Sequence, residues 1–321
     1  MGVAPHDMAD LPINPVVDLS CEEAARILAA WLGEERRPIG LRRMTGGCVH
    51  TVLEFEFEGE GSPVVFKVAH RAHEKSIQAE HDVLRYFRTH TEFPVPEPYA
   101  CDTTGEVVPY SWLIMERLDG GHLGEARMLP EDEDRIQRAM GEAVARLHEH
   151  TRAAGFGHLV GEEQPAESWP AHFGHLLASN YREARDTGLM AGGDRRLCER
   201  VLEATPRALA RAVTPTLVHG DIWATNIMVA GEPGRMRLTG FLDPGGIFAD
   251  PEYELAYLEI WQTVDRRFFE VYAERHRVDG GYELRRMFYW LNTLLLHVWC
   301  FKTEHYASAA AATARRLAAS L

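Results

Sequence analysis

The spacing of hydrophobic residues predicts a helix, then strands, then a second helix in the first part of the chain. Residues 19–33, LSCEEAARILAAWLG, have hydrophobic residues three and four positions apart, and Ser20 and Glu23 form the capping box that begins such a helix. The next three segments alternate hydrophobic and polar residues and are separated by Gly, Ser and Pro, which predicts three antiparallel strands. These segments are IGLRRMTGG, HTVLEFEFEGEG and PVVFKVAH, after which helical spacing returns in HEKSIQAEHDVLRYFRTH.

The pattern then changes from strands to helices. FPVPEPYA, at residues 93–100, has the character of an extended connector, and VVPYSWLIMERLDG indicates two more strands that end at Gly120 and Gly121. The remainder is mainly helical, apart from a short β insertion made of TPTLVHGD, NIMVAG and MRLTGFLDP, with GEPG as a turn. We therefore expect a small β-rich N-terminal lobe at residues 1–117, with residues 1–18 flexible, and a larger helical lobe at residues 118–321.

Composition and charge disfavour several classes of protein. The chain of 321 residues has 34 basic and 48 acidic side chains and a formal net charge of −14, whereas a general nucleic-acid binder needs a basic surface. An acidic protein suits an amine-bearing substrate, although acidity also serves solubility alone. The five cysteines form no C-x-x-C pair, which argues against a zinc ribbon or a disulfide framework. The first residues show neither the basic nor the apolar region of a secretory signal, and there is no run of about 18 apolar residues, so we expect a cytoplasmic protein that does not enter a membrane.

Lys67, in the middle of the strand VVFKVAH, is a candidate for binding phosphate. Glu80 follows thirteen residues later on a predicted helix, and a strand lysine held by a helix glutamate can bind the α- and β-phosphates of ATP. The residues alone leave two alternatives open, a solvated Lys67 and a pair with Glu74. Gly46 and Gly47, between the first two strands, let backbone N–H groups approach phosphates, or serve only to form a tight turn.

The strongest signal is HGDIWATN followed by GFLDPGG. The carboxylate of Asp221, which follows a hydrophobic strand, can orient a substrate hydroxyl for attack. Asn226, five residues later, and Asp243, at the end of the next strand, can supply the oxygen ligands that Mg²⁺ takes beside phosphates and water. We interpret His219 as an anchor of this loop and not as a base. The order of these residues, downstream of a strand lysine, predicts a phosphotransferase.

These motifs resemble those of the fructosamine (ketosamine) kinases, a family within the superfamily of aminoglycoside phosphotransferases and choline kinases. The loop HGDIWATNIMV has the tryptophan of that family at position 223, FLDPGG has Asp-Pro in place of Asp-Phe-Gly, and FFEVYAERHRVDGGYELRRMFYWLNTLLLHVW is similar to its C-terminal helices. The resemblance covers roughly residues 38–320. It implies a bilobal, protein-kinase-like α+β fold and an enzyme that uses ATP and Mg²⁺.

The resemblance also implies roles for single residues. Asp221 is then the catalytic aspartate, and Lys67 binds phosphate with Glu80 as its partner. Asn226 and Asp243 are then the magnesium ligands. The strand end LIMERLDG, which could otherwise be a plain linker, becomes the segment that contacts adenine, through Met115, Glu116 and Leu118.

The resemblance implies a small, amine-bearing acceptor, and we expect a ketosamine of the fructosamine type. A kinase of an aminoglycoside or another amino alcohol is the alternative, since ADPEYELAYL is closer to the aminoglycoside branch, and a non-catalytic nucleotide-binding scaffold is a remote one. A protein kinase is disfavoured because the helical PEYELAY follows Asp243 within about ten residues, which leaves no room for an activation segment. Both a monomer and a homodimer remain open.

Three further interpretations concern residues outside these motifs. Glu254 is interpreted as a brace for the catalytic loop. Cys48 occupies a position that is redox-sensitive in some members of the family, and we carry this over as a hypothesis. Aromatic residues and histidines before residue 182 either wall the acceptor site or pack in the core. They are Trp169, His172, Phe173, His175 and Tyr181.

Overall fold

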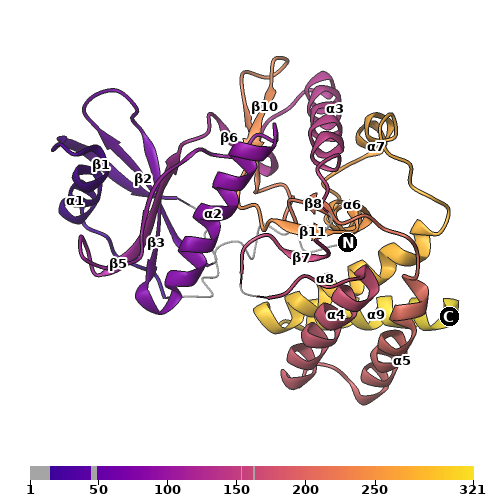
Figure 1. Cartoon of the computed structure of the whole chain (residues 1–321). Helices are drawn as coiled ribbons and strands as arrows, with labels where there is room; N and C mark the ends of the chain where they lie inside the picture. The colour runs from indigo at the N-terminus through magenta and orange to yellow at the C-terminus, as the bar shows by residue number, and fades with distance from the viewer. Residues whose placement is uncertain (1–14, 45–48, 153, 162) are drawn as a thin grey trace. The chain divides into compact units, whose positions relative to one another are not determined.

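The computed structural model describes residues 15–44, 49–152, 154–161 and 163–321, and the chain forms two compact units (Figure 1). The first unit comprises Met1–Ile136 and Ala224–Pro244, and the second comprises Gln137–Trp223 and Gly245–Leu321. Both units are therefore made of two separate stretches of sequence. The lobe boundary expected between residues 117 and 118 stays a prediction.

A five-stranded antiparallel sheet forms most of the first unit, in the order β1-β2-β3-β5-β4. Along β3 every second side chain, Val64, Phe66 and Val68, belongs to a hydrophobic cluster that includes Ile27 and Leu28 of α1, so α1 covers that face. The intervening Lys67 contacts Glu80 of α2, so α2 covers the other face. The elements are α1 (Cys21–Leu32), β1 (Pro38–Arg43), β2 (Thr51–Phe57), β3 (Val64–His70), η2 (Arg71–His73), α2 (Glu74–His90), β4 (Pro98–Asp102) and β5 (Tyr110–Glu116).

The predicted helix at residues 19–33 and the three predicted strands are confirmed as α1 and β1–β3. The capping box of α1 is complete, because the backbone N–H of Glu23 donates to the Ser20 hydroxyl and that of Ser20 donates to the Glu23 carboxylate. Two assignments were wrong. The presumed connector FPVPEPYA contains the start of β4, and VVPYSWLIMERLDG contains one long strand, β5, in place of two. Its prolines obscured β4, but an edge strand tolerates Pro98 as its first residue.

A three-stranded sheet, ordered β10-β9-β6, completes the first unit. It consists of β6 (Gly121–His122), β9 (Ile227–Ala230) and β10 (Arg237–Phe241), and η3 (Leu123–Glu125) follows β6. The hairpin predicted around GEPG is confirmed as β9–β10. The sequence did not reveal β6, which is only two residues long. Gly120 is needed just before it, because its φ is +90° and a Cβ there would lie 1.9 Å from the carbonyl oxygen of Val229.

Asp132 fastens this hairpin to the start of α3 (Pro130–Leu147). Its carboxylate is fully buried and accepts hydrogen bonds from the backbone N–H groups of Leu129, Gly234 and Met236. Burial alone would raise the pKa of Asp132, but these hydrogen bonds outweigh it and lower the pKa to about 2.

We expect Asp132→Asn to lower the thermal unfolding midpoint, because the amide has only one acceptor oxygen for the three backbone donors and the Arg135 guanidinium. The folded-state pKa lies below the value of about 3.9 in an unfolded chain. The stabilisation is therefore present above that value and is lost as the pH falls toward about 2. Unfolding scans of wild type and variant should differ most above pH ~4 and converge in acid. The exposed Asp119→Asn is the control, and a difference independent of pH would contradict the assignment.

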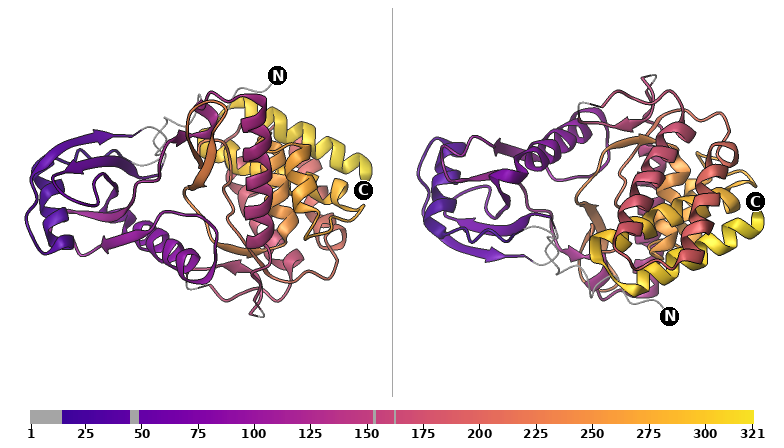
Figure 2. Two further views of the ribbon diagram at one scale, coloured as in Figure 1. Left: turned by 90° about the horizontal axis from the view of Figure 1, so that it is seen from above. Right: turned by 90° about the horizontal axis from the view of Figure 1, so that it is seen from below.

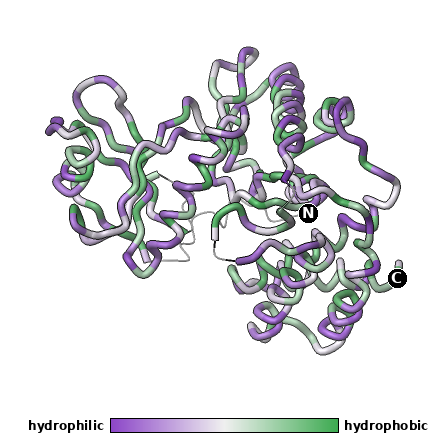
Figure 3. Tube along the Cα trace, viewed as in Figure 1, coloured by the Kyte–Doolittle hydropathy of each residue, from purple (hydrophilic) through white to green (hydrophobic). Residues whose placement is uncertain are grey.

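The second unit is a helical bundle with a small sheet, ordered β7-β11-β8. In it α8 packs against α4, α6 and α9, and the right view of Figure 2 shows the rose helices α4 and α5 beside the orange and yellow helices. The green and purple bands along α4 and α5 in Figure 3 are those of helices with one buried face. The elements are β7 (Gly157–His158), α4 (Trp169–Asp186), α5 (Gly192–Ala208), β8 (Thr216–Val218), β11 (Ile247–Ala249), α6 (Pro251–Ile260), α7 (Arg266–Tyr272), α8 (Tyr282–Phe301) and α9 (Glu304–Ser320).

The mixed α+β fold is confirmed, with an antiparallel sheet in the first unit and mostly helices in the second. No helix among the described residues has the length and apolar character needed to cross a membrane.

Three of the five residues considered for the acceptor site are core residues of the second unit. Trp169, Phe173 and Tyr181 are at most 4% exposed, and the Trp169 indole donates to the Tyr289 hydroxyl over 3.0 Å. Core packing therefore accounts for these three side chains. His175 is exposed and His172 is partly exposed.

Candidate active site

A pocket of about 640 Å³ lies within the first unit, and it contains most of the residues predicted for nucleotide and metal. We call it the Lys67 pocket. Its lining combines apolar side chains of β2, β3, β5 and β9 with polar side chains of β3, β5 and β6 and with Asn226 and Asp243 at the end of the β9–β10 hairpin. The lining residues are Met44, Val52, Val65, Lys67, Met115, Glu116, Arg117, Leu118, His122, Thr225, Asn226, Met228, Leu242 and Asp243. Gly46, Gly47 and Cys48 lie outside the described residues, so their predicted roles stay predictions.

Lys67 is buried and forms ion pairs with both Glu80 and Asp243. Only 5% of the residue is exposed, so the alternative of a solvated lysine is wrong, and its helix partner is Glu80 and not Glu74. Burial alone would lower the pKa of Lys67, but the charges of Asp243 and Glu80 outweigh it and raise the pKa. The ammonium group is therefore charged at any physiological pH.

His50 is a second partner of Glu80 that the sequence did not reveal. Its Nδ1 lies 3.3 Å from the Glu80 carboxylate, and its Nε2 lies 2.8 Å from the Ser76 hydroxyl. Burial alone would raise the pKa of Glu80, but Lys67 and His50 outweigh it and lower the pKa. Glu80 therefore stays charged and fixed from two sides. In the sequence His50 only begins a strand pattern, which gives no sign of this contact.

Asn226 and Asp243 lie at the same end of the β9–β10 hairpin. Phe241 pairs with Ile227 in the ladder, and the backbone N–H of Leu242 donates to the Asn226 carbonyl over 2.8 Å. The two candidate metal ligands therefore lie next to the same backbone hydrogen bond, although they are 17 positions apart in sequence. Asp243 has a φ of +58°, a left-handed conformation that is uncommon outside glycine and that recurs at functional sites.

These two side chains fit a hard divalent cation that is also bound by phosphate. A carboxylate and an amide oxygen are ligands that Mg²⁺ accepts, and the Asp243 side chain is 43% exposed in the pocket that it lines. Among the residues that the structure describes, no three His, Cys, Asp or Glu side chains gather into a metal site of their own. An ion held here would therefore take its other ligands from a bound substrate and from water.

Met115, Glu116 and Leu118 follow the predicted path along one wall of the Lys67 pocket, at the end of β5. The segment is held from both sides. The backbone N–H of Glu116 donates to the Glu97 carbonyl over 2.8 Å, and the Arg117 guanidinium donates to the buried Glu54 carboxylate over 3.0 Å. The segment is therefore fixed in position beside the apolar part of the pocket.

The loop that begins HGD belongs to the second unit up to Trp223, and Glu254 of α6 binds its backbone there. The Glu254 carboxylate is fully buried and accepts the N–H groups of His219 and Gly220 over 3.0 and 2.7 Å. The interpretation of Glu254 as a brace for this loop is confirmed. Gly220 adopts a φ of +88°, which favours glycine at the turn before Asp221.

His148 in turn holds Glu254. Its Nε2 lies 3.2 Å from the Glu254 carboxylate and its Nδ1 lies 2.8 Å from the Tyr272 hydroxyl. Burial lowers the pKa of His148, so the ring is neutral, donating from Nε2 to the carboxylate and accepting at Nδ1 from the phenol. This tautomer satisfies both ring nitrogens.

Asp221 is attached to the rest of the second unit through both its backbone and its side chain. Its N–H donates to Nδ1 of the fully buried His219 over 3.2 Å, which confirms His219 as an anchor of the loop. The hydroxyl of Tyr257 donates to the Asp221 carboxylate. The sequence did not single out Tyr257, because an aromatic residue in a helix is usually a packing residue.

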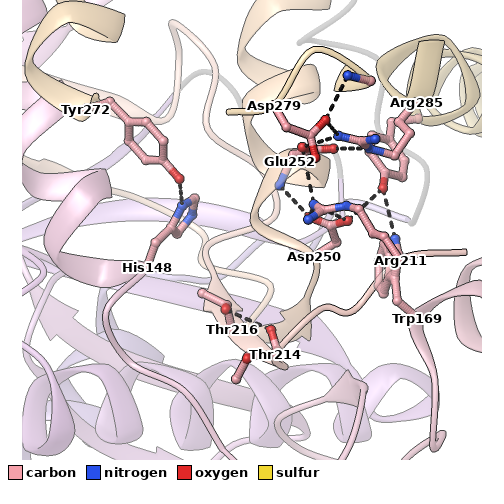
Figure 4. Close-up of polar contacts among 12 residues, drawn as sticks. His148, Trp169, Arg211, Thr214, Thr216, Asp250, Glu252, Tyr272, Asp279 and Arg285 are labelled. Atoms are coloured by element: carbon pink, nitrogen blue, oxygen red, sulfur yellow. Dashed lines mark hydrogen bonds and ion pairs between the residues drawn. The ribbon is translucent and has the colours of Figure 1, made fainter. Parts of the chain in front are cut away.

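A network of charged side chains, of which Asp250, Glu252 and Arg285 are buried, fixes the start of α6, which carries these contacts (Figure 4). Asp250 caps the helix by accepting the N–H of Glu252 over 3.0 Å, and Arg211 binds the Asp250 carboxylate. Arg285 of α8 bonds to Glu252 and Asp279, as the dashed lines of Figure 4 show. Every charge in the network thus has an opposite partner, as buried charges require.

A family model described as fructosamine kinase matches residues 20–319. The chain belongs to the fructosamine kinase family. It is accordingly a phosphotransferase, a small-molecule kinase, and the resemblance inferred from its motifs is confirmed. The assignment rests on nearly the whole chain and not on the HGD loop alone.

Related proteins support this membership. The probable ketoamine kinase of Escherichia coli O157:H7 is 26% identical over 306 residues, which cover 92% of this chain and 98% of the relative. That of Pasteurella multocida is 27% identical over 245 residues, covering 73% and 77% of the two chains. A crystal structure of a candidate fructosamine-3-kinase from Thermobifida fusca has a TM-score of 0.74 at 22% identity, covering 94% of this chain and all of the other. At this identity the structure shows a shared fold.

Proposed function

We propose that this fructosamine kinase family member transfers the γ-phosphoryl group of ATP to a hydroxyl of a ketosamine. One observation carries the proposal: the Lys67 pocket places a charged, buried lysine beside Asn226 and Asp243. A cation for phosphate and two oxygen ligands for a metal are the parts that phosphoryl transfer needs, since positioning and charge neutralisation supply most of its rate.

ATP fits the two chemically distinct parts of the pocket. The apolar walls, which include Val52, Val65 and Met228, suit the adenine ring, and the segment from Met115 to Leu118 can offer backbone groups to its edge. At the polar end, Lys67 would bind the α- and β-phosphates while Glu80 and His50 hold its position. Asp243 would then exchange its ion pair with Lys67 for a metal.

Asn226 and Asp243 would hold Mg²⁺, which when bound neutralises charge on the phosphates. Asp221 would accept a hydrogen bond from the acceptor hydroxyl and orient it toward the γ-phosphorus. It is five residues from Asn226 in the same loop, so the chain itself tethers the proposed base to a proposed metal ligand. The roles of all these residues are proposals.

A ketosamine is the favoured acceptor because curated relatives that span most of this chain are named as ketoamine kinases. A net charge of −14 also suits an amine-bearing sugar. An aminoglycoside is the second candidate. A thermostable mutant of the aminoglycoside phosphotransferase APH(4)-Ia, solved with ADP and hygromycin B, shares the fold with a TM-score of 0.65 at 18% identity, covering 93% of this chain and 98% of the other.

The test measures ATP consumption with Mg²⁺ against fructosyl-lysine, ribosyl-lysine, several aminoglycosides, choline and a generic peptide. We expect turnover with a ketosamine only, and none when Mg²⁺ is removed by a chelator. Asp221→Asn serves as the control for contaminating kinases. Turnover of an aminoglycoside alone would replace the proposed acceptor, whereas ATP binding without any turnover would favour the non-catalytic scaffold.

A further inference from the structure

We propose that Tyr257 is a positioning residue that holds the carboxylate of Asp221 in its reactive orientation. The inference rests on the proposed role of Asp221 and adds a residue to it. Its basis is the hydrogen bond from the Tyr257 hydroxyl to Oδ1 of Asp221, together with the place of Tyr257 on α6.

One turn of α6 forms hydrogen bonds with both the backbone of the HGD loop and the side chain of Asp221. Glu254 and Tyr257 are three residues apart and so point to the same side of the helix. Glu254 fixes the main chain at His219 and Gly220, while Tyr257 binds the side chain of the next residue, Asp221. A carboxylate can rotate about its own bonds even when its backbone is fixed, so the second contact has a separate effect.

Tyr257 can act here only as a donor. Burial and the charge of Asp221 raise its pKa, so the phenol keeps its proton at any pH at which the enzyme works. The neighbouring Tyr253 is affected similarly, and burial followed by the charge of Asp221 raises its pKa to about 12. A protonated phenol that donates to a carboxylate favours the charged form of that carboxylate. The charged form is the one that accepts a hydroxyl proton.

The ring of Tyr257 is itself held in place. Its centroid lies 6.1 Å from that of Trp261, the residue that follows the end of α6, at an interplanar angle of 74°. Trp261 in turn packs against His297 of α8 at 4.8 Å between centroids. The phenol therefore extends from a packed aromatic cluster and has little freedom to follow a moving side chain.

The first test is independent of turnover. In protein labelled with ¹³C at the aspartate carboxyls, the signal absent from Asp221→Asn identifies Asp221, and its titration is followed by NMR. We expect Tyr257→Phe to move the midpoint of Asp221 to higher pH by about 1, because the carboxylate loses a hydrogen bond. Tyr282→Phe is the matched control, because its phenol also donates to a carboxylate, that of Glu259, and it should leave the midpoint unchanged. An unchanged midpoint in Tyr257→Phe would overturn the proposal.

The second test uses whichever acceptor the wild type phosphorylates. We expect Tyr257→Phe to lower kcat about 10-fold and to displace the acid limb of the kcat profile upward, with an unchanged KM for ATP. A merely structural loss would lower the unfolding midpoint as in Tyr282→Phe and leave the pH profile in place. If Tyr257→Phe shifts the titration midpoint of Asp221 but leaves kcat unchanged, the proposal is also overturned. If the wild type phosphorylates nothing, the proposed function fails, and the NMR titration still decides whether Tyr257 holds Asp221.

Discussion

Replacing Asp221 with asparagine is expected to lower kcat by about 10²-fold or more. The amide is nearly the same size and keeps an oxygen that can accept from Tyr257, and the backbone contacts of His219 and Gly220 to Glu254 do not involve the replaced group. The fold of the loop should therefore survive, while the charge proposed to orient the acceptor hydroxyl is lost. Because the Lys67 pocket does not include Asp221, the KM for ATP should change little.

The measurement is a steady-state comparison with the acceptor identified in the panel. Asp186→Asn, an exposed aspartate of the second unit, is the matched control and should retain wild-type kcat. Turnover near the wild-type value in Asp221→Asn would remove Asp221 from the catalytic role. It would then leave the HGD loop without an assigned acceptor for the hydroxyl proton.

Replacing Asp243 with alanine is expected to abolish activity that depends on Mg·ATP. The change removes the only carboxylate among the two proposed metal ligands and leaves the buried Lys67 with Glu80 alone. It also places alanine at a φ of +58°, which costs further free energy in the loop after β10. Both effects act at the end of the Lys67 pocket that we propose for phosphate, so the part proposed for adenine should be unaffected.

Measurements of ATP binding and of turnover separate the loss of a metal ligand from the change in the backbone of the loop. ATP affinity should lose its dependence on Mg²⁺ in Asp243→Ala, and turnover should vanish, whereas Glu58→Ala, at an exposed carboxylate of the same unit, should behave as wild type. Asp243→Asn helps to separate the loss of charge from the change in backbone preference, because asparagine tolerates left-handed conformations. Full activity in Asp243→Ala would exclude Asp243 from the metal site.

The local sequence was sufficient for the main features of both units. Short hydrophobic segments bounded by Gly, Ser and Pro predicted β2 and β3, the capping box predicted α1, and the order of Lys67, Asp221 and Asn226 predicted a phosphotransferase. These elements and this motif can be predicted from sequence because each depends on residues only a few positions apart, or on the spacing within one loop. For Lys67 the residues alone left a solvated side chain and a pair with Glu74 open, and only the resemblance favoured Glu80, with which the structure shows the ion pair.

The features that the sequence did not predict depend on contacts between segments that are far apart in sequence. Tyr257 lies 36 residues beyond Asp221, in a helix where the sequence indicates no role for a tyrosine other than packing. His50 meets Glu80 across 30 residues, and nothing in its neighbourhood in sequence marks it. β6 and β7 have two residues each, which is too short for any period, so only their pairing with β9 and β11 defines them.

The two stretches of sequence that form the first unit are synthesised at different times. Its first stretch ends at Ile136, but the hairpin that carries Asn226 and Asp243 comes only with Ala224–Pro244. At about 5–20 residues per second, several seconds of translation separate the two on the ribosome. During that time β6 has no partner strand, since it pairs with β9. A nascent or prematurely terminated chain therefore carries Lys67 and Glu80 without either proposed metal ligand, and the pocket closes only late in synthesis.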